Sequence, residues 1–117
     1  MTIRFSCAAL ALLALAGCAN DPAPTEQLRL TEQAVAQARA VGATEQAEEL
    51  RQAEDKLQQA QAAMTREAFK DARLLAEQAE LDARLAEARV LTQKSQDQLR
   101  ELNERINRLR RQLGEVK

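Results

Sequence analysis

Histidine, tryptophan and tyrosine are absent from this 117-residue chain, which also has only two phenylalanines, two prolines and three glycines. Catalytic bases and helical di-iron centres commonly use imidazole, so the missing histidine removes the usual proton acceptors and ligands. Glycine-rich phosphate loops are absent as well. We therefore expect no catalytic residues, no metal site and no small-molecule substrate.

Cysteine content and net charge limit the chain further. Of the two cysteines, only Cys18 lies outside the apolar amino-terminal stretch, so the rest of the chain cannot form an internal disulfide. The 17 basic residues nearly balance 18 acidic ones, which gives a formal net charge of −1. This balance gives no reason to expect nucleic acid as a ligand.

Residues 1–17 have the layout of a bacterial lipoprotein signal peptide. Arg4 precedes an apolar stretch, and small residues stand directly before Cys18 in Leu15-Ala16-Gly17-Cys18. The stretch is too short to span a bilayer, which needs about 20 apolar residues. We expect cleavage between Gly17 and Cys18, then attachment of a diacylglycerol to the Cys18 thiol and of an N-acyl chain such as palmitate to its amino group. The alternative is an ordinary secretory signal in which Cys18 is incidental.

The residue after the cysteine indicates which membrane the lipids enter. Aspartate at this position resembles an inner-membrane retention signal, whereas this chain has Ala19. The difference favours the bacterial outer membrane, with the protein on its periplasmic face. Two or more acyl chains make dissociation from a membrane negligible, and we expect no cofactor besides these covalent lipids.

Helix-forming residues dominate the chain after the anchor, and its fold class is predicted to be all-α. The prolines at 22 and 24 make residues 18–24 an extended spacer. Residues 25–98 form an alanine-rich helical domain, whose first helix is expected over 26–41 with Thr25 as its cap and Gly42 ending it. The face of this helix that we expect to be buried consists of Leu28, Val35 and Ala38.

A second helix is expected after Thr44, which is placed to cap it. Its apolar stripe keeps strict spacings of three and four through Leu50, Ala53, Leu57, Ala60 and Met64. Thr65 is placed to cap a third helix that begins near Arg66, with Glu67 in its first turn. No glycine or proline marks this break, so the second and third helices could instead form one rod.

The third helix carries a narrow stripe of mostly small residues, which lets two helix backbones approach closely. The stripe consists of Phe69, Ala72, Ala76, Ala79, Ala83, Ala86 and Val90, and its flanks are broadened by Leu74, Leu75, Leu81 and Leu85. We expect this face to receive an antiparallel helix, with Phe69 as its largest apolar plug. The fold is then a helical hairpin or a three-helix assembly with a long C-terminal helix.

Residues 99–117 change character, because a short coiled-coil seam begins there. Its residues are Leu99, Leu102, Ile106, Leu109 and Leu113. Extended backwards, the same register becomes small and polar at Ala88, Thr92 and Ser95. A seam of about two heptads is marginal alone, so it requires its own chain, a second copy in a homo-oligomer, or a partner protein. A helix over 66–113 would span about 70 Å, so its distal half is expected to project, the alternative being a folded-back bundle.

The same distal segment is basic, with six basic residues against three acidic ones over 100–117. We expect Arg108, Arg110, Arg111 and Lys117 to contact cell-wall carboxylates or an acidic partner by salt-sensitive attraction. The alternative is that these cations only satisfy the dipole at a helix carboxyl terminus.

Two segments carry a resemblance to a known family. Residues 57–64 read LQQAQAAM, and residues 68–88 read AFKDARLLAEQAELDARLAEA. Over roughly 25–88 the chain resembles the family called domain of unknown function 4398, short alanine-rich bacterial lipoproteins with a tight bend between two helices. Members often have glycine at the bend, where this chain has Thr65 and Arg66. The resemblance implies an envelope location, often beside OmpA-like wall-binding proteins, and carries over no catalytic residue.

Together these features predict a lipid-anchored structural or adaptor module that is not an enzyme and acts through helix–helix contacts. Its expected partners are the membrane and an OmpA-like envelope protein, peptidoglycan or a second copy. The alternative is a tether that resembles the murein lipoprotein and is joined to peptidoglycan through Lys117. Murein lipoproteins usually have basic residues before that lysine, whereas Gly114-Glu115-Val116 stand here.

Overall fold

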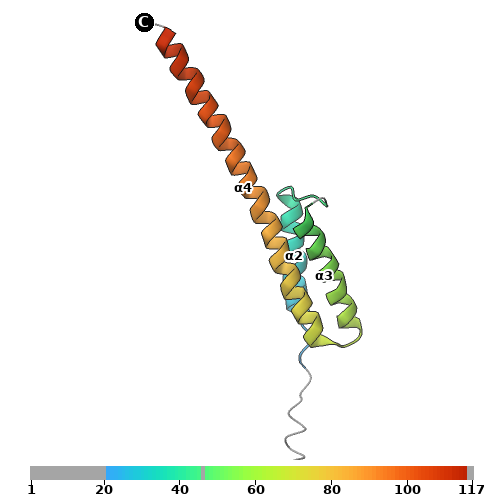
Figure 1. The fold of residues 1–117 in the computed structure, drawn as a ribbon. Coiled ribbons are helices and arrows are strands. Elements are labelled where there is room, and N and C mark those ends of the chain that lie inside the picture. The colour runs from blue at the N-terminus through green and yellow to red at the C-terminus, as the bar shows by residue number, and fades with distance from the viewer. Residues whose placement is uncertain (1–20, 46, 116–117) are drawn as a thin grey trace, which may run out of the picture.

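The computed structural model describes residues 21–45 and 47–115, and these form three helices without a strand. Helix α2 spans Thr25–Ala40, α3 spans Glu48–Thr65 and α4 spans Phe69–Glu115. The two shorter helices lie beside the first half of α4, whose second half extends alone (Figure 1). The predicted all-α class is confirmed. The expected signal peptide, Cys18 and Lys117 lie outside the described residues.

Helix α2 begins one residue earlier than predicted, because Pro24 rather than Thr25 is its N-cap. Proline suits the start of a helix, where its ring restricts φ and no backbone donor is needed. No side chain caps this end, so the predicted capping by Thr25 is wrong. The other end agrees with the prediction, since Gly42 has a φ of +105° and the Ala43 N–H donates to the Ala38 carbonyl oxygen at 3.0 Å.

Helix α3 begins at Glu48, several residues after the predicted cap at Thr44. Ala47 is the N-cap and has no side-chain cap hydrogen bond, so the prediction for Thr44 is also wrong. Two glutamates, Glu48 and Glu49, stand in the first turn, where their negative charges interact favourably with the helix dipole. Helix α3 thus begins on acidic side chains without a hydroxyl cap.

The turn between α3 and α4 forms at the predicted place but by a different mechanism. Thr65 is the last residue of α3, and its hydroxyl donates to the Gln61 carbonyl oxygen at 3.2 Å, so it does not cap the next helix. Glu67 lies in the turn with a φ of +59° rather than in the first turn of α4. The Ala68 N–H then donates to the Ala63 carbonyl oxygen at 3.0 Å. These bonds close the end of α3 and exclude the single-rod alternative.

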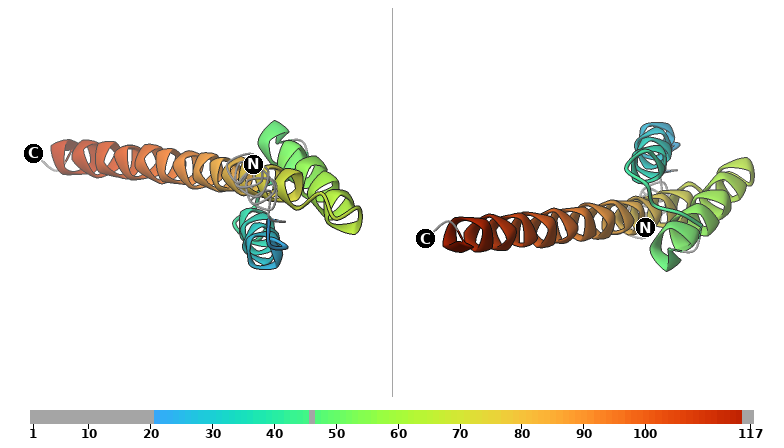
Figure 2. Two further views of the ribbon diagram at one scale, coloured as in Figure 1. Left: turned by 90° about the horizontal axis from the view of Figure 1, so that it is seen from below. Right: turned by 90° about the horizontal axis from the view of Figure 1, so that it is seen from above.

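The core lies along the alanine stripe of α4, which faces the two shorter helices. Seen from below and from above, helices α2 and α3 lie at different positions around the first half of α4 (Figure 2). The predicted burial of this stripe is confirmed at Ala72, Ala76, Ala79, Ala83 and Ala86. The largest fully buried side chains are Leu50 and Thr31. Phe69 is only half-buried, so its predicted role as the largest apolar plug is wrong.

Thr31 is a buried polar residue whose hydrogen-bonding needs are met. Its Oγ1 lies 2.9 Å from the carbonyl oxygen of Gln27 in its own helix and 2.9 Å from that of Ala76 in α4. The single hydroxyl proton can be donated to either oxygen, and each acceptor is already part of a helix. The hydroxyl therefore joins α2 to α4 without leaving an unpaired polar group in the core.

Polar contacts at the rim hold the three helices in register. Lys56 of α3 contacts Asp82 of α4 at 2.5 Å, and Arg89 forms an ion pair with Glu49. Near the α2–α3 connection, the Lys94 ammonium donates to the Val41 carbonyl oxygen at 2.6 Å. These bonds join residues distant in sequence, so they favour one alignment of α4 against its neighbours.

Beyond Val90, helix α4 is no longer buried by its neighbours, although Lys94 still contacts Val41 near the α2–α3 connection. Every residue from 91 to 114 is exposed, although the helix continues without a break. This projecting part is about 36 Å long at 1.5 Å per residue. The predicted projection of the distal half is confirmed, and the folded-back bundle is not adopted.

Candidate functional site

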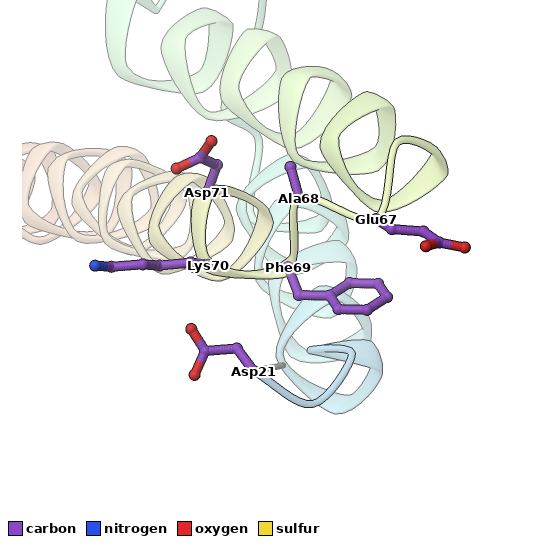
Figure 3. A pocket seen from close by; sticks show the side chains of 6 residues that line it. All are labelled: Asp21, Glu67, Ala68, Phe69, Lys70 and Asp71. Atoms are coloured by element: carbon purple, nitrogen blue, oxygen red, sulfur yellow. The ribbon is translucent and has the colours of Figure 1, made fainter. Parts of the chain in front are cut away.

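Surface hollows of the three-helix part are shallow and open. One of them lies at the turn between α3 and α4 and is lined by Asp21, Glu67, Ala68, Phe69, Lys70 and Asp71. In Figure 3 the Phe69 ring and the Glu67 carboxylate point to one side, whereas the Lys70 ammonium points to the other. The side chains do not converge on a common point, so this hollow has no arrangement that would position a substrate.

The described part of the chain shows neither a metal-binding cluster nor a membrane-spanning helix. There, no group of three or more acidic or thiol side chains is arranged to hold a metal ion. None of the three helices combines the length and the apolar character that crossing a bilayer requires.

The predicted seam is brought onto one face of the projecting part of α4. All five of its side chains are exposed, from 37% for Ile106 to 74% for Leu113. Full burial of such a side chain stabilises a protein by about 1.5–3 kcal/mol relative to leaving it in water. The seam is therefore a large apolar surface that the described residues of its own chain leave uncovered.

Three leucines predicted to flank the buried stripe lie on this exposed face instead. Leu74, Leu81 and Leu85 are 55%, 67% and 46% exposed. Each lies two residues after a buried alanine, and two residues rotate a helix by about 200°, so they point away from the core. The flanking prediction is wrong for these three, whereas Leu75 packs against the buried cluster that contains Leu28.

The exposed leucines share one continuous register, which we call the leucine face. Its spacings of three and four run without interruption through Leu74, Gln78, Leu81, Leu85, Ala88, Thr92, Ser95, Leu99, Leu102, Ile106, Leu109 and Leu113. Small or polar residues separate its two leucine-rich ends. The predicted seam register ends at Ala88, because the leucines that precede Ala88 were placed on the flanks of the buried stripe. Counting the spacing through the whole helix would have found them.

The predicted basic residues are placed at the distal end of α4. Arg108 lies 3.7 Å from Glu104, four residues earlier, and Arg105 similarly pairs with Glu101. Exposed pairs of this kind contribute little to stability. Arg110 and Arg111 are exposed on the same part of the helix, while Lys117 is outside the described residues. The predicted basic residues that are described thus share one helix end with the seam.

Glu80 carries the clearest electrostatic perturbation near the core. Arg84 donates a hydrogen bond to its carboxylate, and Gln27 of α2 donates another at 2.7 Å, so the pKa of Glu80 lies below its ordinary value of 4.5. The side chain is only 18% exposed. Because Gln27 belongs to α2, the charged carboxylate helps to hold α2 against α4.

We expect Glu80→Gln to reduce the loss of thermal stability on acidification. The folded-state pKa of Glu80 is lowered, so its contribution is present above the ordinary pKa and is lost as the pH falls through the folded value. Melting followed by circular dichroism between about pH 6 and about pH 3 measures this loss. The control, Glu45→Gln in the exposed α2–α3 connection, should lose as much stability as the unsubstituted chain. Equal acid sensitivity of all three proteins would contradict the assigned role of Glu80.

Comparisons with known proteins agree with this fold. The sequence profile of the family described as domain of unknown function (DUF4398) matches residues 26–102. The crystal structure of a DUF4398 family protein from Pseudomonas aeruginosa PAO1, solved at 2.47 Å resolution, is 67% identical in sequence and superposes with a TM-score of 0.80. That match covers 82% of this chain and 100% of the other. A comparison with curated proteins found no match. The three-helix chain with its long α4 therefore belongs to the DUF4398 family.

Proposed function

We propose that this protein is a lipid-anchored, non-enzymatic module of the bacterial envelope that acts through helix–helix contacts on α4. The observation that carries the proposal is the exposed leucine face on a helix that extends beyond its own core. A water-exposed apolar stripe with coiled-coil spacing is suited to packing against another helix. The leucine face offers no catalytic groups.

The second half of the proposal concerns the lipid anchor at Cys18. The thiol of Cys18 carries a diacylglycerol and its amino group an N-acyl chain, both in the outer membrane, and the protein faces the periplasm. The first described residue, Asp21, follows Cys18 by three positions in the sequence, and Arg73 of α4 donates a hydrogen bond to the Pro22 carbonyl oxygen at 3.5 Å. The short spacer thus leads to the end of the molecule at which α4 begins. Attachment there keeps the leucine face outside the lipid.

Substitution Cys18→Ala is expected to release the protein from membranes while leaving its helices folded. Two or more acyl chains supply almost all of the membrane affinity, so the protein without them has nothing else that holds it in the membrane. Membrane and soluble fractions of cells that produce each variant, compared by immunoblotting, measure the change.

Cys7→Ala is the matched control, because it removes the other cysteine and leaves the lipidation site intact. This control should stay in the membrane fraction. If the Cys18→Ala protein fractionates with membranes as before, the anchored function is wrong.

A further inference from the structure

We infer that the leucine face binds the leucine face of a second copy in an antiparallel coiled coil centred between Thr92 and Ser95. The inference rests on the proposed function, and it names the partner that α4 contacts. Three observations carry it: the position of the face on α4, the order of its residues, and the charges beside them.

The position of the face leaves it open to a second copy. Each of its residues up to Thr92 follows a residue of the core stripe by two positions, so α2 and α3 lie on the opposite side of α4. A second helix can therefore run along α4 from Leu74 to Leu113 without meeting the three-helix part. This overlap is about 60 Å long. A repeat of 3.5 residues drifts by about 20° per heptad around a straight helix, so the two helices would wind into a left-handed supercoil.

The order of residues along the leucine face suits an antiparallel pair, in which the face of one copy runs in the opposite direction to the face of the other. In an antiparallel pair, the a position of one helix lies opposite the d position of the other. Two leucine-rich ends flank the small and polar centre, so reversal places each end against the other. The resulting layers are Leu113 with Leu74, Leu109 with Gln78, Ile106 with Leu81, Leu102 with Leu85, Leu99 with Ala88 and Ser95 with Thr92 of the second copy.

A parallel pair would place like charges side by side. In that arrangement each g position lies beside the e position five residues later in the partner. The charged neighbours would be Glu77 with Asp82, Arg84 with Arg89 and Arg105 with Arg110. All three combinations are repulsive, and each occurs twice in a symmetric dimer.

The antiparallel pair places opposite charges together instead. Glu77 lies beside Arg105 of the second copy, and Asp82 lies beside its Arg110. The acidic start of α4 thereby meets the basic end of its partner. The pair that Arg105 forms with Glu101 on its own helix is exposed and weak, so it does not prevent this contact. Charge sets the orientation that the leucine layers permit.

The antiparallel arrangement places the two lipid anchors far apart. In the antiparallel pair the two starts of α4 lie about 70 Å apart, at opposite ends of the coiled coil. Both lipid anchors reach one membrane when the coiled coil lies along its surface. The dimer would therefore lie parallel to the membrane rather than project from it.

Disulfide crosslinking of the full-length protein in intact cells tests the inference. Leu85 and Leu102 are 46% and 53% exposed, so their replacement by cysteine leaves the core unchanged. Within one chain they are about 25 Å apart, too far for a disulfide. We expect the double variant L85C/L102C to give a band of twice the monomer mass on non-reducing gels. Each single variant should give no more than the background from Cys7 and Cys18 in the unsubstituted chain.

Every other pattern overturns the antiparallel dimer. Crosslinking of both single variants would show a parallel pair, and no crosslinking in any variant would show that the second copy does not bind this face. The charges are tested in the L85C/L102C background, where Glu77→Arg should lower the yield of crosslinked protein severalfold and added Arg105→Glu should restore it. Failure to restore the yield would contradict the assigned orientation. The fractionation of Cys18→Ala is read separately, so loss of the dimer and loss of the anchor are distinguishable.

Discussion

Replacement of Leu50 by alanine is expected to lower the free energy of unfolding of the three-helix part by about 2–5 kcal/mol. Leu50 is fully buried and belongs to the cluster that contains Val35, Ala53 and Ala83. Most other members of this cluster are alanines, which cannot extend to fill the space that the missing methyl groups leave. The cost therefore includes both the lost transfer of apolar surface and an unfilled cavity.

Thermal unfolding followed by circular dichroism measures this effect. A loss of 2–5 kcal/mol in a small domain corresponds to a fall of about 10 °C or more in the melting midpoint. The control is Leu91→Ala, which makes the same change at a side chain that is 45% exposed and outside the leucine face. Equal melting midpoints for the two variants would show that Leu50 does not fill the core.

Replacement of Ala83 by leucine is expected to destabilise the protein by about 1–3 kcal/mol, although it adds apolar surface. Ala83 is fully buried where α4 meets its neighbours, and it shares its cluster with Val35, Ala38 and Leu50. The helices approach closely because these contacts use methyl side chains. A leucine at this position must displace a neighbouring backbone or adopt a strained rotamer.

The matched control is Ala62→Leu, because Ala62 is exposed on α3. The control should melt close to the unsubstituted protein, since alanine and leucine have similar helix propensities. A midpoint for Ala83→Leu as high as that of Ala62→Leu would contradict close packing along the alanine stripe.

These two expectations follow from an unusual core. Alanine buries little area, so the three-helix part depends on the close approach of backbones and on a few larger side chains such as Leu50 and Leu28. Contacts at the rim, such as that of Lys56 with Asp82, fix the alignment of the helices more than they stabilise the fold. The larger apolar side chains of α4 lie mostly on its exposed face, which is why a second helix has much to bury there.

The ends of the helices show where residue type is a poor guide. Thr25, Thr44 and Thr65 were each predicted to cap a helix, and none of them does. A hydroxyl residue favours a cap in an isolated helix by about 1 kcal/mol, which contacts between helices can outweigh. Gly42 was predicted correctly, because few other residues adopt its left-handed backbone without strain.

Composition and spacing were sufficient to predict an all-helical chain, the buried alanine stripe and the distal seam, because helix periodicity places residues three and four apart on one face. They left open whether the second and third helices form a hairpin or one rod, and whether the distal seam projects or folds back. They did not distinguish the inward from the outward leucines of α4. Leu74, Leu81 and Leu85 are as apolar as any core residue, and their burial depends on the side from which α2 and α3 approach. Those helices dock on the alanines, since small side chains allow the closest contact, and this docking leaves the leucine face open along the whole of α4.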